Sequence, residues 1–531
     1  MWQTAWAPGQ REQQLRTLKN TPEHWDVVVA GGGITGAGIA REAARRGLKV
    51  LLVERQDFAW GTSSRSSKMV HGGLRYIAQG DIKTTMHSVH ERERLMTEAP
   101  GLVDQMGYVM AHYKGGFPGP FVFNTLLRVY DFFAGKRYRR FFKRDDFDFL
   151  SPYINDNHLI GGTQFADAVT DDARLVVRVL REAQKDGAVV LNYLGVKNLV
   201  KTDGQVTGAV LEDALSGDLI PVRADVIINA TGAWADELRG QMMAEKKIRP
   251  ARGSHIVVPN WRLPVAQSYT VLHPDDKRPI FIFPWEGRTV IGTTDLDNGG
   301  ITNTEATMTR AELEYLLRVA CVQFPKSELK ERDIISSWAG VRPLVSSGAL
   351  NPSKEKRDHS VWDDKGLVSV SGGKLTTFRL IALDVLEAAR KYIRRYPVGE
   401  FSAQIFTPAD IVSSRFEQLP GYLQKRVSGH FGMDAEGLLE LSARDELDVI
   451  PGSRTLWAEV RWAAARECVQ HLDDLMLRRT RLGLLLEQGG AQVAERIRVI
   501  CAEEMGWSDE RWAQEWLRYQ DIWHKHYSVP V

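Results

Sequence analysis

The segment DVVVAGGGITGAGIAREAARRGLKVLLVE, residues 26–54, decides the fold that we expect for this chain. An apolar run leads into Gly31, Gly33 and Gly36, a helix-compatible stretch follows, and a second apolar run ends on Glu54. The order strand, glycine turn, helix, strand and acid is typical of a dinucleotide-binding unit. The glycines allow a tight turn and the close approach of a pyrophosphate. Glu54 is spaced to accept hydrogen bonds from a ribose diol.

The composition is that of a large globular protein. At 531 residues the chain should hold more than one domain, and its 43% hydrophobic and 26% charged content are ordinary. The net charge of +2 is too small to create a positive electrostatic field that would attract nucleic acid, so we expect no nucleic-acid partner. Three scattered cysteines form no C-x-x-C pair, which argues against disulfides or structural zinc and favours a cytoplasmic location. The sequence shows no signal peptide, no metal site and no apolar run of the roughly twenty residues that a membrane span needs.

The order of elements along the chain predicts three regions. Residues 1–25 form a polar N-terminal extension, residues 26–400 a nucleotide-binding domain with an interleaved substrate (cap) domain, and residues 401–531 a helical C-terminal domain. We expect a helix at 171–186. Strand-like pieces with proline boundaries over 249–300 predict an antiparallel sheet, which often forms the floor of a substrate pocket.

Glycine-bearing segments recur far apart in the sequence. They are the opening turn, GTSSRSSKMVHGGLRY at 61–76, INATGAW at 228–234 and SGGKLTTFR at 371–379. Contacts spread this widely suit a cofactor whose redox ring lies far from its adenine, and FAD is such a cofactor. A polar surface loop is the alternative for 61–76. The candidate cofactor-binding residues are Gly31, Gly33, Gly36, Glu54, Thr62, Ser63, Ser64, Ser67, Lys68, Gly72, Gly73, Thr231, Gly232, Gly373, Lys374, Leu375 and Thr376.

These segments, with GSHIVVP, IGTTD and GVRPL, resemble the FAD-dependent (aerobic, respiratory) glycerol-3-phosphate dehydrogenases, in the glycine/D-amino-acid oxidase-like flavoprotein superfamily. The resemblance runs from about residue 24 to 380 and extends to the helical tail, but is loose over 111–150. It implies an α/β fold: a discontinuous Rossmann-like FAD-binding domain, an antiparallel-sheet substrate domain and a helical C-terminal domain. The implied reaction oxidises sn-glycerol 3-phosphate to dihydroxyacetone phosphate by hydride transfer to flavin N5, with electrons passed to a quinone.

Two arginines are the candidates for binding the substrate phosphate. A phosphomonoester carries nearly two negative charges, and a planar guanidinium binds its oxygens bidentately. Arg75 precedes Tyr76 just after two glycines, and Arg342 lies in the G-V-R-P-L turn. The resemblance implies that both arginines face the phosphate, with Tyr76 also lining the substrate site.

The candidate catalytic residues are His71, His255 and Lys374. Oxidising a secondary alcohol removes a hydroxyl proton, which an imidazole can accept near neutral pH. His71 lies in V-H-G-G and His255 begins a strand in G-S-H. Which histidine acts as the base is left open. Lys374 follows two glycines, where it can stabilise the negative charge that develops on a reduced flavin.

A basic aromatic segment, KRYRRFFKR at 136–144, follows the apolar stretch FVFNTLLRVYDFF at 121–133. Six basic and three aromatic residues in nine positions suit an anionic lipid surface, although a solvated charged face is the common alternative. Because the family delivers electrons to a membrane quinone, we expect peripheral association with the inner face of the cell membrane.

Three other functions remain open at this point. A related oxidase would pass electrons to oxygen. An amine or amino-acid oxidase would bind a substrate carboxylate in place of the phosphate. A catalytically silent flavoprotein would act only as a binding or regulatory subunit. The sequence also leaves a homodimer open.

Overall fold

The computed structural model describes residues 4–21, 23–74, 77, 81–242, 245–300, 304–346 and 358–530. The opening segment forms the predicted unit of β1 (His24–Ala30), α2 (Ile34–Ala44) and β2 (Val50–Val53). All four residues of β2 and the last four of β1 are buried, as expected of apolar strands covered on both faces.

The first sheet is assembled from three separate stretches of the chain. Its main order is β17-β18-β10-β1-β2-β7, with β9 pairing β10 and β8 pairing β9. The five strands from β18 to β7 run parallel, and β17 closes one edge antiparallel. The remaining strands are β7 (Val189–Leu191), β8 (Leu194–Thr202), β9 (Gln205–Asp213), β10 (Leu219–Asn229), β17 (His359–Asp364) and β18 (Leu367–Gly372). The discontinuous Rossmann-like domain is confirmed.

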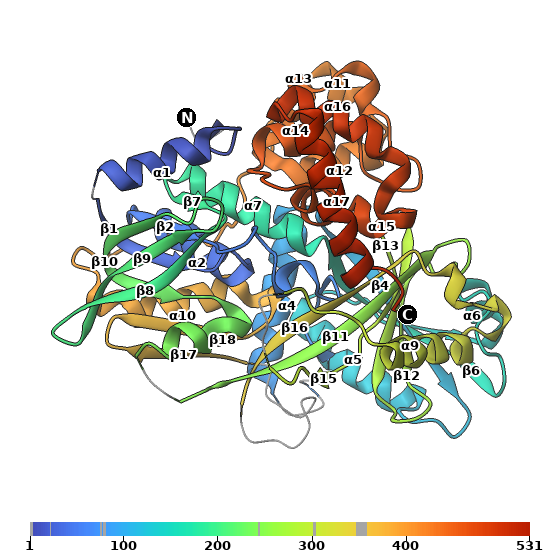
Figure 1. Cartoon of the computed structure of the whole chain (residues 1–531). Helices are drawn as coiled ribbons and strands as arrows, with labels where there is room; N and C mark the ends of the chain where they lie inside the picture. Colours follow the sequence, from blue (N-terminus) through green and yellow to red (C-terminus); the bar gives the residue numbers. More distant parts are fainter. Residues whose placement is uncertain are drawn as a thin grey trace.

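The second sheet has ten strands and lies beside the first (Figure 1). Its strand pairs are antiparallel, apart from the short parallel contact of β12 with β4. The antiparallel sheet expected at 249–300 is therefore confirmed, and strands from 69–170 extend it. Its strands are β3 (Met69–Val70), β4 (Val103–Tyr113), β5 (Arg140–Lys143), β6 (Leu159–Thr170), β11 (Ile248–Pro259), β12 (Ser268–Leu272), β13 (Pro279–Trp285), β14 (Arg288–Gly292), β15 (Leu296–Asp297) and β16 (Ser336–Val345).

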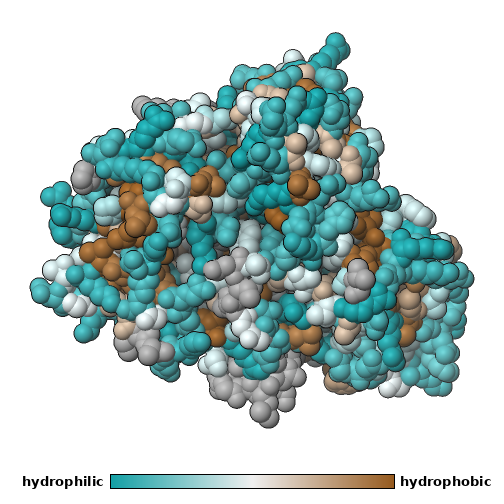
Figure 2. Space-filling model, viewed as in Figure 1, coloured by the Kyte–Doolittle hydropathy of each residue, from teal (hydrophilic) through white to brown (hydrophobic). Residues whose placement is uncertain are grey.

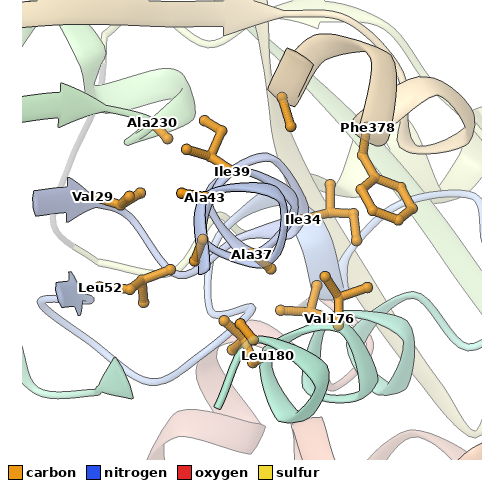
Figure 3. Packing of buried hydrophobic residues seen from close by; sticks show 14 of the residues in the cluster. Val29, Ile34, Ala37, Ile39, Ala43, Leu52, Val176, Leu180, Ala230 and Phe378 are labelled. Atoms are coloured by element: carbon orange, nitrogen blue, oxygen red, sulfur yellow. The ribbon is translucent and has the colours of Figure 1, made fainter. Parts of the chain in front are cut away.

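Helix α2 packs between two other helices on one face of the first sheet. They are α7 (Asp172–Lys185), which confirms the predicted helix at 171–186, and α10 (Phe378–Ala389). Figure 3 shows Ala37 near Val176 and Ile34 near Phe378. Small side chains allow this close packing: a Cβ at Gly38 would lie 2.7 Å from the Phe378 ring.

The polar N-terminal extension is anchored to the domain. It contains α1 (Gln10–Asn20), and the buried Trp6 stacks on Phe58 with ring centroids 4.8 Å apart. Arg11 is buried and donates to the carbonyl oxygen of Asn192 at 3.0 Å. The polar composition of residues 1–25 gave no sign of this packing, because only a few large side chains make the contacts.

Helices gather at the C-terminal end of the chain above both sheets (Figure 1). They are α11 (Ser414–Glu417), α12 (Gly421–Phe431), α13 (Ala435–Leu441), α14 (Trp457–Arg466), α15 (Leu482–Leu485), α16 (Ala494–Met505) and α17 (Asp509–His526), with a π-helical turn η11 (Asp474–Arg479). Trp457, Trp462 and Trp523 are buried among these helices.

Four more helices pack against the second sheet: α4 (Ile82–Glu98), α5 (Pro120–Ala134), α6 (Arg144–Leu150) and α9 (Arg310–Gln323). A short helix, α8 (Ala235–Arg239), follows β10. Within the described ranges, no helix combines the length and the apolar character that a bilayer crossing requires.

Candidate active site

A cavity of about 370 Å³ opens where the parallel strands of the first sheet end. The residues after β1, β2, β10 and β18 all line it, because the carboxyl ends of parallel strands meet at one edge. Of the predicted cofactor-binding residues, the structure brings together around this cavity Gly31, Gly33, Glu54, Thr62, Ser63, Thr231, Gly232, Gly373, Lys374 and Leu375.

The three glycines of the opening turn serve two purposes. A Cβ at Gly36 would lie 1.9 Å from the carbonyl oxygen of Gly31, and a Cβ at Gly31 would lie 2.4 Å from that of Ala230. These two glycines let the turn pack on itself and on β10. Gly33 differs, because its Cβ would meet only the side chain of Ser63, at 3.1 Å. Gly33 precedes α2 and leaves backbone room for a diphosphate at the helix N-terminus.

Glu54 occupies the place that a ribose-binding acid requires. Its carboxylate accepts the backbone N–H groups of Gly32 at 2.7 Å and Gln56 at 2.9 Å. Burial raises the pKa of Glu54, and the two backbone hydrogen bonds oppose that rise. The hydrogen bonds fix the carboxylate at the end of β2, where it lines the cavity.

The opposite wall is the glycine turn after β18. Gly372 and Gly373 both have φ of 82°, and a Cβ at Gly372 would lie 2.6 Å from the carbonyl oxygen of Asp358. Lys374 follows, with its ammonium 3.3 Å from the hydroxyl of Ser88. The cavity therefore combines a buried acid, a helix N-terminus and a glycine turn with a lysine. This set of groups fits FAD: ribose, diphosphate and isoalloxazine ring in turn.

Two tryptophans that line the cavity were not predicted. The rings of Trp60 and Trp234 lie 5.6 Å apart, and both contact the cavity. Trp234 ends the INATGAW motif, so its position in the motif was an available signal. Lys197 and Gln241 also line the cavity, but they lie in ordinary polar segments that carry no such signal.

Residues 61–74, here called the flavin loop, are held mainly by distant side chains. The buried carboxylate of Asp172 accepts from the N–H and hydroxyl of Ser66, from Lys68 at 2.9 Å and from Arg481. Arg481 also donates to the carbonyl oxygen of Ser64 at 2.8 Å. The α7 N-cap is the neighbouring Asp171, so Asp172 acts on the loop rather than as the helix cap.

Several predicted cofactor ligands in this loop lie away from the cavity. The Lys68 ammonium is fully buried against Asp172 and the rings of Trp285 and Trp338, so its prediction as a cofactor contact is not supported by its placement. Burial, together with nearby Arg481, lowers the pKa of Lys68 to about 8. Others outside the cavity lining are Gly36, Ser64, Ser67, Gly72, Gly73 and Thr376.

His71 is tied to the turn that follows Lys374. Its N–H donates to Thr376 Oγ1 at 3.2 Å, and the same hydroxyl donates to the His71 carbonyl oxygen at 3.2 Å. The structure therefore places His71 beside the glycine–lysine wall of the cavity. Arg75 and Tyr76 lie outside the described residues.

His255 and Arg342 lie on adjacent strands of the second sheet. A Cβ at Gly253, two residues before His255 on β11, would lie 2.1 Å from the Arg342 guanidinium, so both side chains share one face of the sheet. His255 is buried, stacks on Trp338 at 4.8 Å and meets the Ser67 hydroxyl through Nε2 at 2.9 Å. Among the described residues its Nδ1 has no hydrogen-bond partner.

The electrostatics of this pair suit an anionic alcohol. Burial holds the pKa of His255 well below its usual value, and the charges of Arg342 and Lys68 lower it further, so the imidazole stays neutral. Arg342 is 21% exposed and donates to Asp295 at 3.0 Å and to Thr293 Oγ1 at 2.8 Å. The adjacent Pro343 lines the FAD cavity, and Thr62 of the cavity wall donates to the Val341 carbonyl oxygen, so the backbone of β16 at Arg342 runs along the edge of the cofactor site.

Comparisons with known proteins agree with this geometry. Residues 26–379 match the family described as FAD dependent oxidoreductase, and residues 387–512 match the C-terminal domain of alpha-glycerophosphate oxidase. The chain is 33% identical over 501 residues to an aerobic glycerol-3-phosphate dehydrogenase of Staphylococcus haemolyticus, covering 88% of each chain. It is 37% identical over 403 residues to that of Bacillus subtilis, covering 74% of this chain and 71% of the relative.

A solved structure extends the likeness over the full length. The glycerol-3-phosphate dehydrogenase from Bacillus halodurans, complexed with FAD, superposes with a TM-score of 0.77 at 25% identity and covers 98% of both chains. An L-alpha-glycerophosphate oxidase from Mycoplasma pneumoniae shares the fold, with a TM-score of 0.57 at 18% identity.

Proposed function

Because the chain belongs to the FAD-dependent oxidoreductase family, together with the glycerol-3-phosphate dehydrogenases, we propose that it oxidises sn-glycerol 3-phosphate to dihydroxyacetone phosphate. The observation that carries the proposal is the shared sheet face of Arg342 and His255, at the point where β16 passes the edge of the FAD cavity. A guanidinium that recognises a phosphomonoester and a neutral imidazole that accepts a proton are the two functions this substrate requires.

Each of the following residues would have a separate role in the reaction. Arg342, with Arg75, binds the phosphate and so sets the position of carbon 2. A neutral histidine, His255 or His71, accepts the hydroxyl proton. FAD, when bound, supplies the acceptor for the hydride that leaves carbon 2. Lys374 and the backbone N–H groups of its turn place positive charge where the reduced ring gains negative charge.

We propose a quinone as the electron acceptor, reached from the inner face of the cell membrane. Support comes from the segment around α5 and α6, where Phe121 is 85% exposed, Phe132 80% and Phe149 89%. Large exposed apolar side chains beside basic residues are typical of an interfacial surface. The face of the molecule in Figure 2 is largely hydrophilic, with apolar side chains in small patches.

Ion pairs limit the number of charges in this segment that could attract lipid. Arg139 is paired with Asp131 and Lys136 with Glu93, so these two charges are already neutralised. The remaining cations of the segment, all exposed, are Arg137, Arg140, Lys143 and Arg144. Helix α6 also carries three exposed acids: Asp145, Asp146 and Asp148. Their negative charge weakens the attraction to anionic lipid, so the exposed phenylalanines should contribute more of the binding free energy.

The reaction is tested by adding glycerol 3-phosphate anaerobically to the yellow, FAD-loaded protein. We expect the oxidised-flavin absorbance to disappear, and we expect glycerol, which lacks the phosphate, to bleach it far more slowly. Oxidised flavin that persists with glycerol 3-phosphate would rule out the proposed substrate. Readmitting either oxygen or a soluble quinone to the reduced protein then separates an oxidase from a quinone-linked dehydrogenase.

The membrane surface is tested by flotation with anionic vesicles at low and high salt. Replacing Arg137, Arg140, Lys143 and Arg144 by Gln and Phe121 and Phe132 by Ser should abolish flotation, while flavin bleaching by the substrate survives. A matched control replaces four exposed lysines elsewhere by Gln and should still float: Lys201, Lys246, Lys277 and Lys326. Equal flotation of both variants would place the membrane surface elsewhere.

A further inference from the structure

The amide that follows His71 enters a buried hydrogen-bond network outside the FAD cavity. The Gly72 N–H donates to the phenol oxygen of Tyr130 at 2.8 Å and to Asp167 Oδ1 at 3.2 Å. Tyr130 comes from the inner side of α5 and Asp167 from β6, and both are buried. We propose that Tyr130, together with Asp167, is a positioning residue that fixes the backbone of His71 for proton transfer. The inference rests on the proposed function.

The network allows only one arrangement of its protons. The Tyr130 hydroxyl donates to Asp167, and Arg92 of α4 donates to the same phenol oxygen at 3.1 Å and to Asp167. Since the phenol proton points to the carboxylate, the phenol oxygen is left to accept from Arg92 and from Gly72. Burial and the neighbouring Asp167 raise the pKa of Tyr130, which keeps this donor protonated. Among the described residues Arg92 Nε has no hydrogen-bond partner, but the Tyr130 phenol oxygen and Asp167 Oδ1, which hold Gly72, are both bonded, and this limits how the backbone at Gly72 can move.

Close packing adds to the hydrogen bonds. A Cβ at Gly72 would lie 2.4 Å from the Tyr130 phenol oxygen and 2.4 Å from Val89 Cγ2. The backbone at Gly72 is therefore pressed against α4 and α5. The loop cannot shift toward these helices without a clash.

The other side of His71 is held independently. Thr376 binds both the N–H and the carbonyl oxygen of His71, as described above. Thr376 therefore holds the peptide groups on both sides of His71, and the α5–β6 network holds the second of them again through the Gly72 N–H. Because the direction of a side chain follows its backbone, this double attachment sets where the imidazole lies. A displacement of about 1 Å can cost about a hundredfold in rate.

The variant Tyr130→Phe tests the inference, because it keeps the ring and removes only the hydroxyl. Tyr269→Phe is the matched control: Tyr269 is equally buried and its hydroxyl donates to Ser151 Oγ at 2.7 Å, away from the flavin loop. Both holoenzymes are compared with the original protein for FAD content, for hydrogen exchange of the Gly72 amide, and for anaerobic flavin reduction over a range of glycerol 3-phosphate concentrations.

For Tyr130→Phe we expect faster exchange at Gly72, by about tenfold. The limiting rate of flavin reduction should fall about tenfold or more, because the base is misplaced. The half-saturating substrate concentration should change by less than about twofold, since Arg342 still binds the phosphate. FAD content should stay unchanged, and Tyr269→Phe should match the original protein in all three measurements.

Two results would overturn the inference. One is unchanged exchange and unchanged limiting rate in Tyr130→Phe. The other is a parallel loss in both variants that tracks FAD content, which would indicate a merely structural role. If the original protein is itself not reduced by glycerol 3-phosphate, the proposed function fails, and the Gly72 exchange still decides whether Tyr130 holds the loop.

Discussion

The glycine turn at 31–36 and the flavin loop at 61–74 line the same cavity but are held in different ways. The turn is shaped by backbone against backbone, with Gly36 packed on Gly31. The loop is shaped by side chains far away in the sequence, such as Asp172, which binds Ser66, and Arg481, which binds Ser64. A turn of the first kind is fixed by a few adjacent residues, whereas a loop of the second kind depends on the whole fold.

The C-terminal helices take part in this second kind of support. Arg478 and Arg479 of η11 both donate to the buried carboxylate of Asp57, just before the flavin loop. These two cations hold the pKa of Asp57 below its usual value although burial alone would raise it. The helical domain therefore helps to shape the cofactor site without lining the cavity.

The largest effect should come from removing the carboxylate that organises the loop. Asp172→Ala leaves the buried Lys68 and Arg481 without their shared partner, so we expect a loss of about 3–5 kcal/mol in the free energy of unfolding, together with reduced FAD content. Urea denaturation of the apoprotein measures the loss. Asp218→Ala, which breaks the exposed pair with Lys19, is the control and should change little. A similar small change in both variants would mean that Asp172 does not organise the loop.

The next effect tests the glycine turn itself. In Gly36→Ala the new Cβ would lie 1.9 Å from the Gly31 carbonyl oxygen, so the backbone must move and we expect about 3 kcal/mol of destabilisation even without FAD. Gly33→Ala is the matched control, because its Cβ meets only a side chain. It should keep the fold and weaken FAD binding, as measured by titration of the apoprotein. If Gly33→Ala unfolds the protein as well, the two glycines do not have separate roles.

The contrast between turn and loop explains what the sequence could predict. The order of β1, α2 and β2 and the sheet at 249–300 follow from apolar periodicity and glycine spacing, which are local, whereas the discontinuous first sheet was implied by the family resemblance. The motifs also identified Glu54, Gly33, Thr231 and Lys374 at the cavity. The division of the chain at residues 25 and 400 remains our proposal.

The sequence could not show where the side chains of the flavin loop point. Lys68 lies in a motif with cofactor-facing neighbours, yet its ammonium turns toward Asp172, a partner 104 residues away. The packing of Trp6 on Phe58 was missed for the same reason, because a polar stretch gives no sign of its distant contact. The shared sheet face of His255 and Arg342 depends on the register of β11 with β16, in which Arg342 lies opposite Ala251.

A pH dependence should report the burial of Lys68. Its pKa is lowered from 10.5 to about 8, so between these values the unfolded chain binds more protons than the folded one. The contribution of Lys68 to stability must therefore rise with pH in this window. Relative to Lys68→Met, the original protein should gain about 2 kcal/mol between about pH 7.5 and about pH 9.5, measured by urea denaturation. Parallel pH curves would mean that Lys68 titrates outside this range.

The smallest effect concerns the C-terminal contact with the flavin loop. The phenol oxygen of Tyr527 accepts from Arg65 at 2.9 and 3.2 Å, and Ser337 separately holds the Tyr527 carbonyl oxygen through its N–H at 2.7 Å. Tyr527→Phe removes the contacts of the hydroxyl with Arg65 and Glu305 but leaves the backbone contact of Ser337, so the chain end stays docked. We expect a loss of about 1 kcal/mol in unfolding free energy, a typical value for one hydrogen-bond group.

The exposed Tyr422 provides the control for this variant, because Tyr422→Phe removes a hydroxyl that solvent can replace. It should leave the unfolding free energy unchanged in the same urea denaturation. A loss of several kcal/mol in Tyr527→Phe would show that the backbone contact of Ser337 cannot hold the chain end alone. The flavin loop would then depend on the last residues of the chain as strongly as on Asp172. No measurable loss would mean that Arg65 is held by its remaining partners, the carbonyl oxygen of Trp60 and the carboxylate of Glu305.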